Sequence, residues 1–230
     1  MKINTFYSLD NAKRAEGLTV VIDVFRAFTT ACYLADKNPQ RIIPVGDLEE
    51  AYRLKKENPK YLLMGERDGK IQPGFNFGNS PYRIRNEIFK RKTIVFTTTC
   101  GTQGINRAVN AKEIITGSFV NADATIKYIR SRKPAMVSLI CTGTINEHIL
   151  DEDACCAEYI KNALLNKRNN FEKIVTHLKT AGFAKWFFDP AVHSHPLEDF
   201  ELCVSLNKFN FILKVAPYKN NLVYLKKIDV

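Results

Sequence analysis

Several features of membrane, secreted and metal-thiolate proteins are missing from this sequence. No apolar run approaches the ~20 residues that a membrane-spanning helix needs, and the start, MKINTFYSLDNAK, has no apolar stretch of signal-peptide type. The six cysteines show no Cys-x-x-Cys spacing, which argues against a zinc knuckle or a redox dithiol. There is also no internal repeat and no low-complexity linker. We therefore expect a cytoplasmic protein with reduced cysteines, no membrane partner and a single domain over residues 1–230.

Three sequence signatures of phosphate chemistry are absent as well. The P-loop pattern Gly-x4-Gly-Lys-Ser/Thr does not occur. A cysteine phosphatase needs Cys-x5-Arg, but the spacing from Cys100 to Arg107 is Cys-x6-Arg. An aspartyl-phosphate mechanism wants a second acid two residues after Asp23, where Phe25 stands. If the chain hydrolyses phosphate esters, metal-activated water is the most economical route left.

The charge balance is the one unusual total. Lys and Arg number 34 against 24 Asp and Glu, which gives a formal net charge of +10. A nucleic-acid surface and the attraction of a small polyanion both fit this excess. The basic residues are scattered, and their densest groups, 90–92 and 130–133, fall where helices should end and where cations suit the helix dipole. We favour solvated helix ends, with a small anionic substrate next, and expect no nucleic-acid partner.

Short runs rich in β-branched residues alternate with helical patterns along the first two thirds of the chain. The runs predict strands over 19–24, 41–45, 61–64, 93–97, 113–116 and 136–141. The patterns between them predict helices over 27–37, 47–57, 80–91, 101–110 and 121–132, the third of which would begin at Ser80-Pro81. This alternation predicts an α/β fold in three layers, with a largely parallel or mixed sheet and helices on both faces.

After Asp151 the pattern changes. A long helix is expected to about residue 168, shorter helices within 171–188 and 197–206, and a C-terminal hairpin of strands over 209–215 and 222–226.

Polar residues follow the predicted strand ends, and in open α/β sheets ligands bind at that edge. Four segments carry these residues: Asp23 with Arg26, Thr29 and Thr30; Glu66 with Arg67; the turn Thr97, Thr98, Thr99, Cys100, Gly101 and Thr102; and Thr142 to Thr144 followed by the acids 151–153. We therefore expect acidic residues, arginines, hydroxyl groups and glycines to lie together at this edge of the sheet.

The carboxylates at this edge have two interpretations. Asp23 either caps the helix that starts at Ala27 or holds a divalent cation. Asp153 projects onto the apolar stripe of its helix with Cys156 and Ile160, and Glu152 projects to the margin of that stripe. A buried carboxylate needs a partner, and a metal ion or a bound cation would supply one.

Two segments are candidates for binding an anion. The turn at 97–102 is either a plain strand-to-helix connection or a cradle of amides and hydroxyls. The stretch 65–81, GERDGKIQPGFNFGNSP, is either a surface excursion or a lid, with Arg67 as a fork for an oxyanion and Asn79-Ser80 at its far end. His193 and His195 are interpreted as loop residues.

With these residues in view, the chain resembles the 2-phosphosulfolactate phosphatase family. The resemblance lies in VVIDVFRAFTT at 20–30, GER at 65–67, GFNFGNSP at 74–81, TTCGT at 98–102, EDACCA at 152–157 and FELCVSLN at 200–207. It spans nearly the whole chain, and the family usually has asparagine at the position of Cys100.

The resemblance implies an α/β fold and a magnesium-dependent phosphatase that converts 2-phosphosulfolactate to 3-sulfolactate, a step toward coenzyme M. We expect Mg²⁺ to be held by carboxylates drawn from Asp23, Glu66, Glu152 and Asp153. Asp23, Arg26, Glu66, Arg67 and Asp153 are the candidate catalytic residues. The candidate substrate-binding residues are Thr29, Thr30, Asn79, Ser80, Thr98, Thr99, Gly101 and Thr102.

Two alternatives stay open at this point. One is a phosphatase of the same fold that acts on another phosphorylated hydroxy acid. The other, which we rank lower, is a basic nucleic-acid-binding protein. A homodimer is left open as well.

Overall fold

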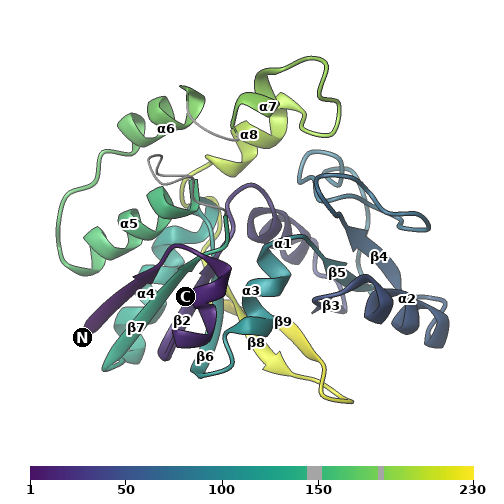
Figure 1. Cartoon of the computed structure of the whole chain (residues 1–230), viewed down its shortest axis with the longest axis horizontal. Helices are drawn as coiled ribbons and strands as arrows, with labels where there is room; N and C mark the ends of the chain where they lie inside the picture. Colours follow the sequence, from purple (N-terminus) through teal and green to yellow (C-terminus); the bar gives the residue numbers. More distant parts are fainter. Residues whose placement is uncertain (144–151, 181–183) are drawn as a thin grey trace.

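The larger of two sheets forms the centre of the molecule. The structure, a computed structural model, describes residues 1–143, 152–180 and 184–230. Within them, six strands pair in the order β1-β7-β2-β6-β8-β9 (Figure 1). Their bounds are β1 Lys2–Phe6, β2 Gly17–Ile22, β6 Ala111–Gly117, β7 Met136–Cys141, β8 Phe211–Pro217 and β9 Val223–Asp229. The first four pair in parallel and β8 runs antiparallel to both neighbours. The predicted α/β class with a mixed sheet and a C-terminal hairpin is confirmed.

A smaller parallel sheet lies beside the larger one. It has the order β3-β5-β4, with β3 Arg41–Pro44, β5 Thr93–Thr97 and β4 Leu62–Gly65. The sequence predicts these strands but not their separation into a second sheet, since alternating strands and helices look alike in either arrangement. Val21 of the larger sheet, Phe96 of the smaller sheet and Phe28 of the helix that follows β2 share one hydrophobic cluster. The two sheets therefore pack against a common core.

Helices cover both faces of the larger sheet. They are α1 Ala27–Asp36, α3 Gly101–Arg107, α4 Ala122–Arg132 and α5 Glu152–Leu164. Alternate residues of a strand point to opposite faces, and accordingly Val20 and Ile22 pack with α4 and α5, whereas Val21 packs with α1 and α3. β2 is a continuous apolar run because both of its faces are buried. The predicted three layers describe this part of the molecule.

Helix α2 (Leu48–Glu57) covers the outer face of the smaller sheet. Asp47, the first residue of the helix predicted over 47–57, is its N-cap, because its side chain accepts a hydrogen bond from the Glu50 amide at 2.7 Å. Ala51 and Leu54 of this helix pack against a small cluster from the three strands, namely Ile43, Leu63 and Val95.

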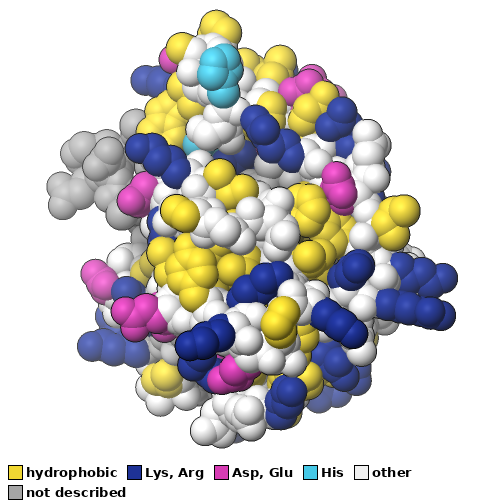
Figure 2. Space-filling model, turned by 90° about the vertical axis from the view of Figure 1, so that its right-hand side faces the viewer, with side chains coloured by type: hydrophobic (Ala, Val, Ile, Leu, Met, Phe, Trp, Pro, Cys, Tyr) yellow, Lys and Arg dark blue, Asp and Glu magenta, His cyan; other side chains and the backbone are white. Residues whose placement is uncertain are grey.

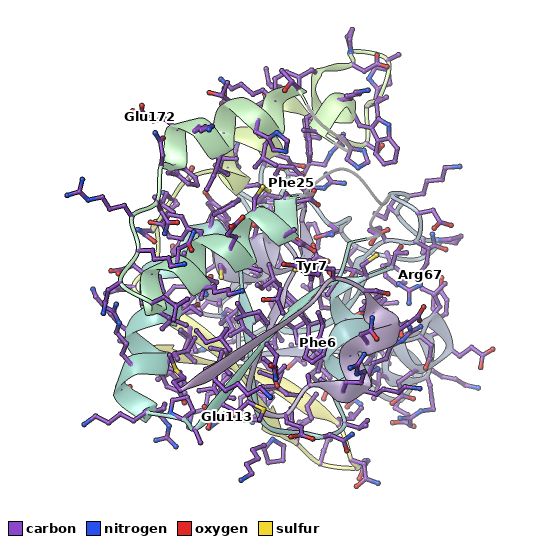
Figure 3. All side chains as sticks on the ribbon, turned by 60° about the vertical axis from the view of Figure 1, so that its left-hand side comes forward. Phe6, Tyr7, Phe25, Arg67, Glu113 and Glu172 are labelled. Atoms are coloured by element: carbon purple, nitrogen blue, oxygen red, sulfur yellow. The ribbon has the colours of Figure 1, made fainter. Side chains whose placement is uncertain are left out.

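Three further helices lie on the side where the parallel strands of the larger sheet end (Figure 1). They are α6 Phe171–Thr180, α7 Lys185–Phe188 and α8 Leu197–Cys203. The side chain of Phe25, just after β2, packs beneath them, with its ring centroid 5.1 Å from that of Phe187 and 5.7 Å from that of Phe200 (Figure 3). These aromatic contacts bring residues 186–199 next to the end of β2.

Some predicted elements differ from those observed. The helix expected from Ser80-Pro81 is wrong, because residues 81–86 form successive turns. The Ser80 hydroxyl accepts a hydrogen bond from the Arg83 amide at 3.2 Å, as an N-cap would, but the Tyr82 amide donates to the Asp199 side chain at 2.9 Å. An amide in the first turn of a helix has no acceptor within the helix, and here Asp199 supplies one for Tyr82. The strand β1 and two 3-10 helices, η1 Leu9–Arg14 and η2 Phe119–Asn121, were not predicted.

The basic side chains are dispersed over the surface. On the face shown in Figure 2, Lys and Arg lie among hydrophobic, acidic and neutral side chains rather than in one stripe.

Among the described residues, no helix combines the length and the apolar character that a bilayer crossing requires. Five of the six cysteines are buried, as expected, and Cys100 is half-buried.

Candidate active site

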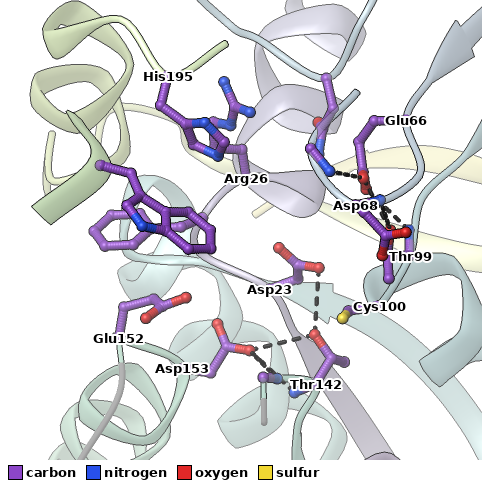
Figure 4. Close-up of a pocket in the computed structure, with 15 residues that line it drawn as sticks. Asp23, Arg26, Glu66, Asp68, Thr99, Cys100, Thr142, Glu152, Asp153 and His195 are labelled. Carbon is purple, nitrogen blue, oxygen red and sulfur yellow. Dashed lines mark hydrogen bonds between the residues drawn. The ribbon is translucent and has the colours of Figure 1, made fainter. Parts of the chain in front are cut away.

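A cavity of about 340 Å³ opens where β2, β4, β5 and β7 end (Figure 4). Residues from all four segments that the sequence places at this edge line it, so the predicted convergence is confirmed. The lining residues are Asp23, Phe25, Arg26, Glu66, Asp68, Gly69, Asn79, Thr99, Cys100, Thr142, Gly143, Glu152, Asp153, Trp186 and His195.

Asp23 follows β2 and is 6% exposed. Arg26 is the N-cap of α1, but Asp23 Oδ1 accepts a hydrogen bond from the Ala27 amide, the first of the helix, at 2.8 Å, which partly matches the capping interpretation. Its Oδ2 lies 3.3 Å from the Thr142 hydroxyl and faces the cavity (Figure 4). Burial and the nearby charge of Glu66 raise the pKa of Asp23 to about 6. The capping role and a role in the cavity are therefore compatible.

Asp153 lies on the buried side of α5, as predicted, and is 1% exposed. Its Oδ1 accepts from the Val24 amide at 2.8 Å, and its Oδ2 accepts from the amides of Thr142 and Gly143 at 3.0 Å each. Backbone amides thus provide partners that the sequence analysis sought from a cation. The Thr142 hydroxyl lies 3.3 Å from the carboxylates of both Asp153 and Asp23, which brings the two acids together. The neighbouring acid 151 lies outside the described residues.

Glu66 follows β4 and is held by the turn after β5. The Thr99 amide donates to Oε1 at 2.9 Å, and the Thr99 hydroxyl and the Gly69 amide donate to Oε2 at 2.9 and 2.8 Å. This placement needs Gly65, because a Cβ there would lie 1.7 Å from the Thr97 carbonyl oxygen, and its φ is +135°. The glycine at the start of the 65–81 stretch therefore serves the close approach of β4 to β5.

The acids make one side of the cavity strongly negative. Cys100, the half-buried thiol among them, has its pKa raised to about 12 by burial and by the charges of Asp23, Asp153, Glu66 and Glu152. The thiol is therefore protonated at neutral pH and is a poor nucleophile.

The other side of the cavity carries Arg26 and His195 (Figure 4). Trp186 also lines the cavity, and its ring lies 5.5 Å from that of His195. The Arg26 Nη1 donates to Asp199 Oδ2 at 2.6 Å and to the Ser194 carbonyl at 3.0 Å, and the guanidinium carbon lies 5.8 Å from the Phe187 ring centroid. Burial and the charge of Arg26 lower the pKa of His195 to about 4, so its ring is neutral at physiological pH. The cavity thus has an acidic side and a side with one fixed cation.

Arg67 and the predicted hydroxyls of α1 lie away from the cavity. Arg67 donates to the carbonyls of Glu66 and Gly46 and to the Thr97 hydroxyl, which ties β4 to its neighbours. The hydroxyl of Thr29 donates to the Val24 carbonyl at 2.8 Å, and Thr30 is fully buried. None of these three described residues lines the cavity. Their predicted catalytic or binding roles stay predictions.

The threonine-glycine turn binds the site's own carboxylates and hydroxyls. The amides of Thr98 and Thr102 donate to each other's hydroxyls at 3.0 and 3.2 Å, and the Gly101 amide donates to Asp23. A Cβ at Gly101 would come within 2.7 Å of Asp23 Oδ2, so only glycine leaves room for the carboxylate. An anion cradle made of these amides stays a prediction. At the end of the 65–81 stretch, Asn79 lines the cavity and Ser80 donates to Asp199 at 2.9 Å.

Two residues at or beside the cavity, His195 and Asp199, were not predicted as parts of the site. His195 is a loop residue, as interpreted, but it also lines the cavity, with its ring edge-on to Trp186 and Phe187 at centroid distances of 5.5 and 5.4 Å. Asp199 is fully buried although its place in the first turn of α8 is typical of an acid that faces solvent. Nothing local in the sequence shows that these residues approach β2, because the contact joins segments more than 160 residues apart.

The acidic side suits a hard cation in its chemistry. No three ligating side chains are assembled as a metal site within residues 1–143, 152–180 and 184–230. Mg²⁺, however, is typically held by one or two carboxylates, with waters and substrate oxygens completing its shell. A cation would also offset the repulsion between Asp23 and Glu66 that helps to raise the pKa of Asp23. The donor set therefore fits a magnesium ion with few protein ligands.

Comparison with known proteins gives one consistent result. A family model described as 2-phosphosulpholactate phosphatase matches residues 5–217. A Clostridium tetani protein named "Probable 2-phosphosulfolactate phosphatase" is 30% identical over 234 residues, which cover 97% of this chain and 100% of that protein. A Thermotoga petrophila protein of the same name is 32% identical over 229 residues, covering 90% of this chain and 91% of that protein.

Other relatives align over a shorter region. A Caldicellulosiruptor saccharolyticus protein with the same name is 39% identical over 148 residues, covering 63% of this chain. That alignment spans 61% of the relative, and the alignment with a Thermotoga maritima protein spans 63%, so the chain matches less than two thirds of the length of these two proteins.

Proposed function

This chain belongs to the 2-phosphosulpholactate phosphatase family, and we propose that it hydrolyses 2-phosphosulfolactate to 3-sulfolactate and inorganic phosphate. The observation that carries the proposal is the division of one cavity into an acidic side and a side with a buried arginine. A small phosphate ester with two further negative groups requires a site of this kind. The names of the relatives supply the particular substrate.

The acidic side of the cavity would receive the phosphoryl group together with Mg²⁺. Asp23 and Glu152 are the ligands we propose, because both carboxylates line the cavity and Asp23 Oδ2 faces into it. A bound magnesium ion supplies charge neutralisation and lowers the pKa of water. Glu66 and Asp153 would then fix the turns from which the ligands project.

The opposite side would bind the groups that do not react. The Arg26 guanidinium uses Nη1 for Asp199 and Ser194, and its other nitrogens donate to no described residue, so they are available to a carboxylate or sulfonate. The neutral ring of His195 completes this side without adding negative charge. Fixing these groups would orient the phosphate ester toward the acids.

The reaction then needs only water as the second reactant. Its oxygen adds to phosphorus, the bond from phosphorus to the C2 oxygen breaks, and the leaving alkoxide takes up a proton to give the hydroxyl of 3-sulfolactate. The net positive charge of +10 would favour the approach of such an anion. A role in coenzyme M formation stays a prediction.

Phosphate release from 2-phosphosulfolactate, with Mg²⁺ and with a chelator, tests the proposal. We expect release that depends on Mg²⁺; no metal dependence would contradict the mechanism. Parallel assays with phospholactate, which lacks the sulfonate, and with 3-phosphoglycerate test the substrate. Faster turnover of either compound would assign the site to another phosphorylated hydroxy acid.

A further inference from the structure

Asp199 is a buried acid for which the proposed chemistry has no direct use. Its side chain is fully buried, and Asp199 belongs to the first turn of α8. Oδ2 forms an ion pair with Arg26 at 2.6 Å. Oδ1 accepts hydrogen bonds from the Ser80 hydroxyl and the Tyr82 amide at 2.9 Å each. One carboxylate therefore joins three segments: the end of β2, the turn at 80–82 and α8.

Several carboxylates other than Asp199 could form an ion pair with the guanidinium of Arg26. Arg26 is 4% exposed, and the cavity it lines also contains five acids. These five acids are Asp23, Glu66, Asp68, Glu152 and Asp153. Without the Asp199 carboxylate, Arg26 would pair with these acids, because a buried positive charge needs a negative partner. Such a pairing would close the cavity to anions and occupy the oxygens that we assign to Mg²⁺.

The short ion pair with Asp199 prevents this arrangement. Asp199 does not line the cavity, so the pair anchors Arg26 from behind, and the Ser194 carbonyl and the Phe187 ring add contacts from the same side. We propose that Asp199 is a positioning residue, which holds Arg26 apart from the acidic side so that the cavity stays open to an anionic group of the substrate.

The second oxygen of Asp199 extends this role. Through Ser80 and Tyr82 it fixes the end of the 65–81 stretch, where Asn79 lines the cavity. The same carboxylate thus sets the position of Arg26 relative to Asn79. The inference rests on the proposed function for the identity of the substrate, but its central claim concerns the binding of an anion.

Equilibrium binding of sulfoacetate, a small anion with one carboxylate and one sulfonate, tests the inference by calorimetry without turnover. In Asp199→Asn we expect binding roughly 10- to 100-fold weaker, the loss typical of a misplaced charged hydrogen-bond donor. With 2-phosphosulfolactate, KM should rise by a similar factor while kcat changes less. Glu201→Gln, an exposed acid of the same helix, is the matched control and should bind as the unaltered protein does.

Each outcome decides the inference. Unchanged sulfoacetate binding by folded Asp199→Asn overturns it, as does a failure of the unaltered protein to bind sulfoacetate. If Asp199→Asn does not fold, Asp199→Glu replaces it, because glutamate keeps the charge opposite Arg26 but displaces it by one methylene group. Weaker sulfoacetate binding by Asp199→Glu supports the inference, and binding at full strength contradicts it. Normal sulfoacetate binding without hydrolysis of 2-phosphosulfolactate would refute the proposed function alone.

Discussion

Replacing Asp23 with asparagine is expected to abolish nearly all turnover and, at the same time, to stabilise the metal-free protein at neutral pH. The pKa of Asp23 rises from 3.8 to about 6 on folding, chiefly through burial and also through the charge of Glu66. Since each pKa unit corresponds to about 1.4 kcal/mol, the ionised carboxylate destabilises the fold by up to about 3 kcal/mol. Asparagine keeps the acceptor for the Ala27 amide and carries no charge.

The sign of the effect depends on pH in a defined way. The folded-state pKa lies above the unfolded one, so the penalty is complete above about pH 6 and fades as the pH falls toward 3.8. Asp23→Asn should therefore raise the melting temperature at pH 8 by roughly 6 °C or more in a chain of this size, and should give little gain near pH 4.

Thermal unfolding in a chelating buffer at both pH values measures this difference. Asp68→Asn is the control, because Asp68 lines the same cavity but is exposed, and its φ of 52° suits asparagine. We expect no change for Asp68→Asn. A melting temperature of Asp23→Asn that is not raised at pH 8, or a gain of equal size at both pH values, would refute the reasoning.

Three further predictions follow from other parts of the fold. Gly65→Ala should destabilise the protein by at least roughly 2 kcal/mol in denaturant titrations, whereas Gly78→Ala, whose Cβ would meet its nearest neighbour at 3.9 Å, should not. The pKa of His195 is lowered to about 4, so the unfolded chain binds this proton first and stability falls between about pH 6.5 and 4; His195→Gln should remove that part of the pH dependence. Glu113→Gln, at the far end of the sheet (Figure 3), should weaken the fold by about 1 kcal/mol and leave phosphate release unchanged, because neither it nor its partners Tyr128 and Lys214 are among the described residues that line the cavity.

Local sequence patterns predicted most elements because their cause is local. The apolar run of β2, the capping Asp47 and the hairpin of β8 and β9 each follow from residues within the element itself. The rule that ligands bind at the carboxyl ends of parallel strands then placed Asp23, Glu66, Thr99 and Asp153 around one cavity.

What the sequence did not reveal depends on contacts between distant segments. The division into two sheets is set by which strands pair, and pairing leaves no mark on the pattern of a single strand. The ion pair of Arg26 and the hydrogen bonds of Ser80 and Tyr82 share one partner, Asp199, which approaches them from a segment more than 110 residues away. Likewise, partners for the buried Asp153 came from backbone amides just after the ends of β2 and β7, which side-chain patterns do not show.

A crystal structure with Mg²⁺, 3-sulfolactate and phosphate bound would test the central claim most directly. We predict a magnesium ion in contact with Asp23, phosphate beside it, and the sulfonate or carboxylate of 3-sulfolactate on Arg26. Ligands bound elsewhere on the protein, or a metal ion remote from Asp23 in the occupied cavity, would contradict the account.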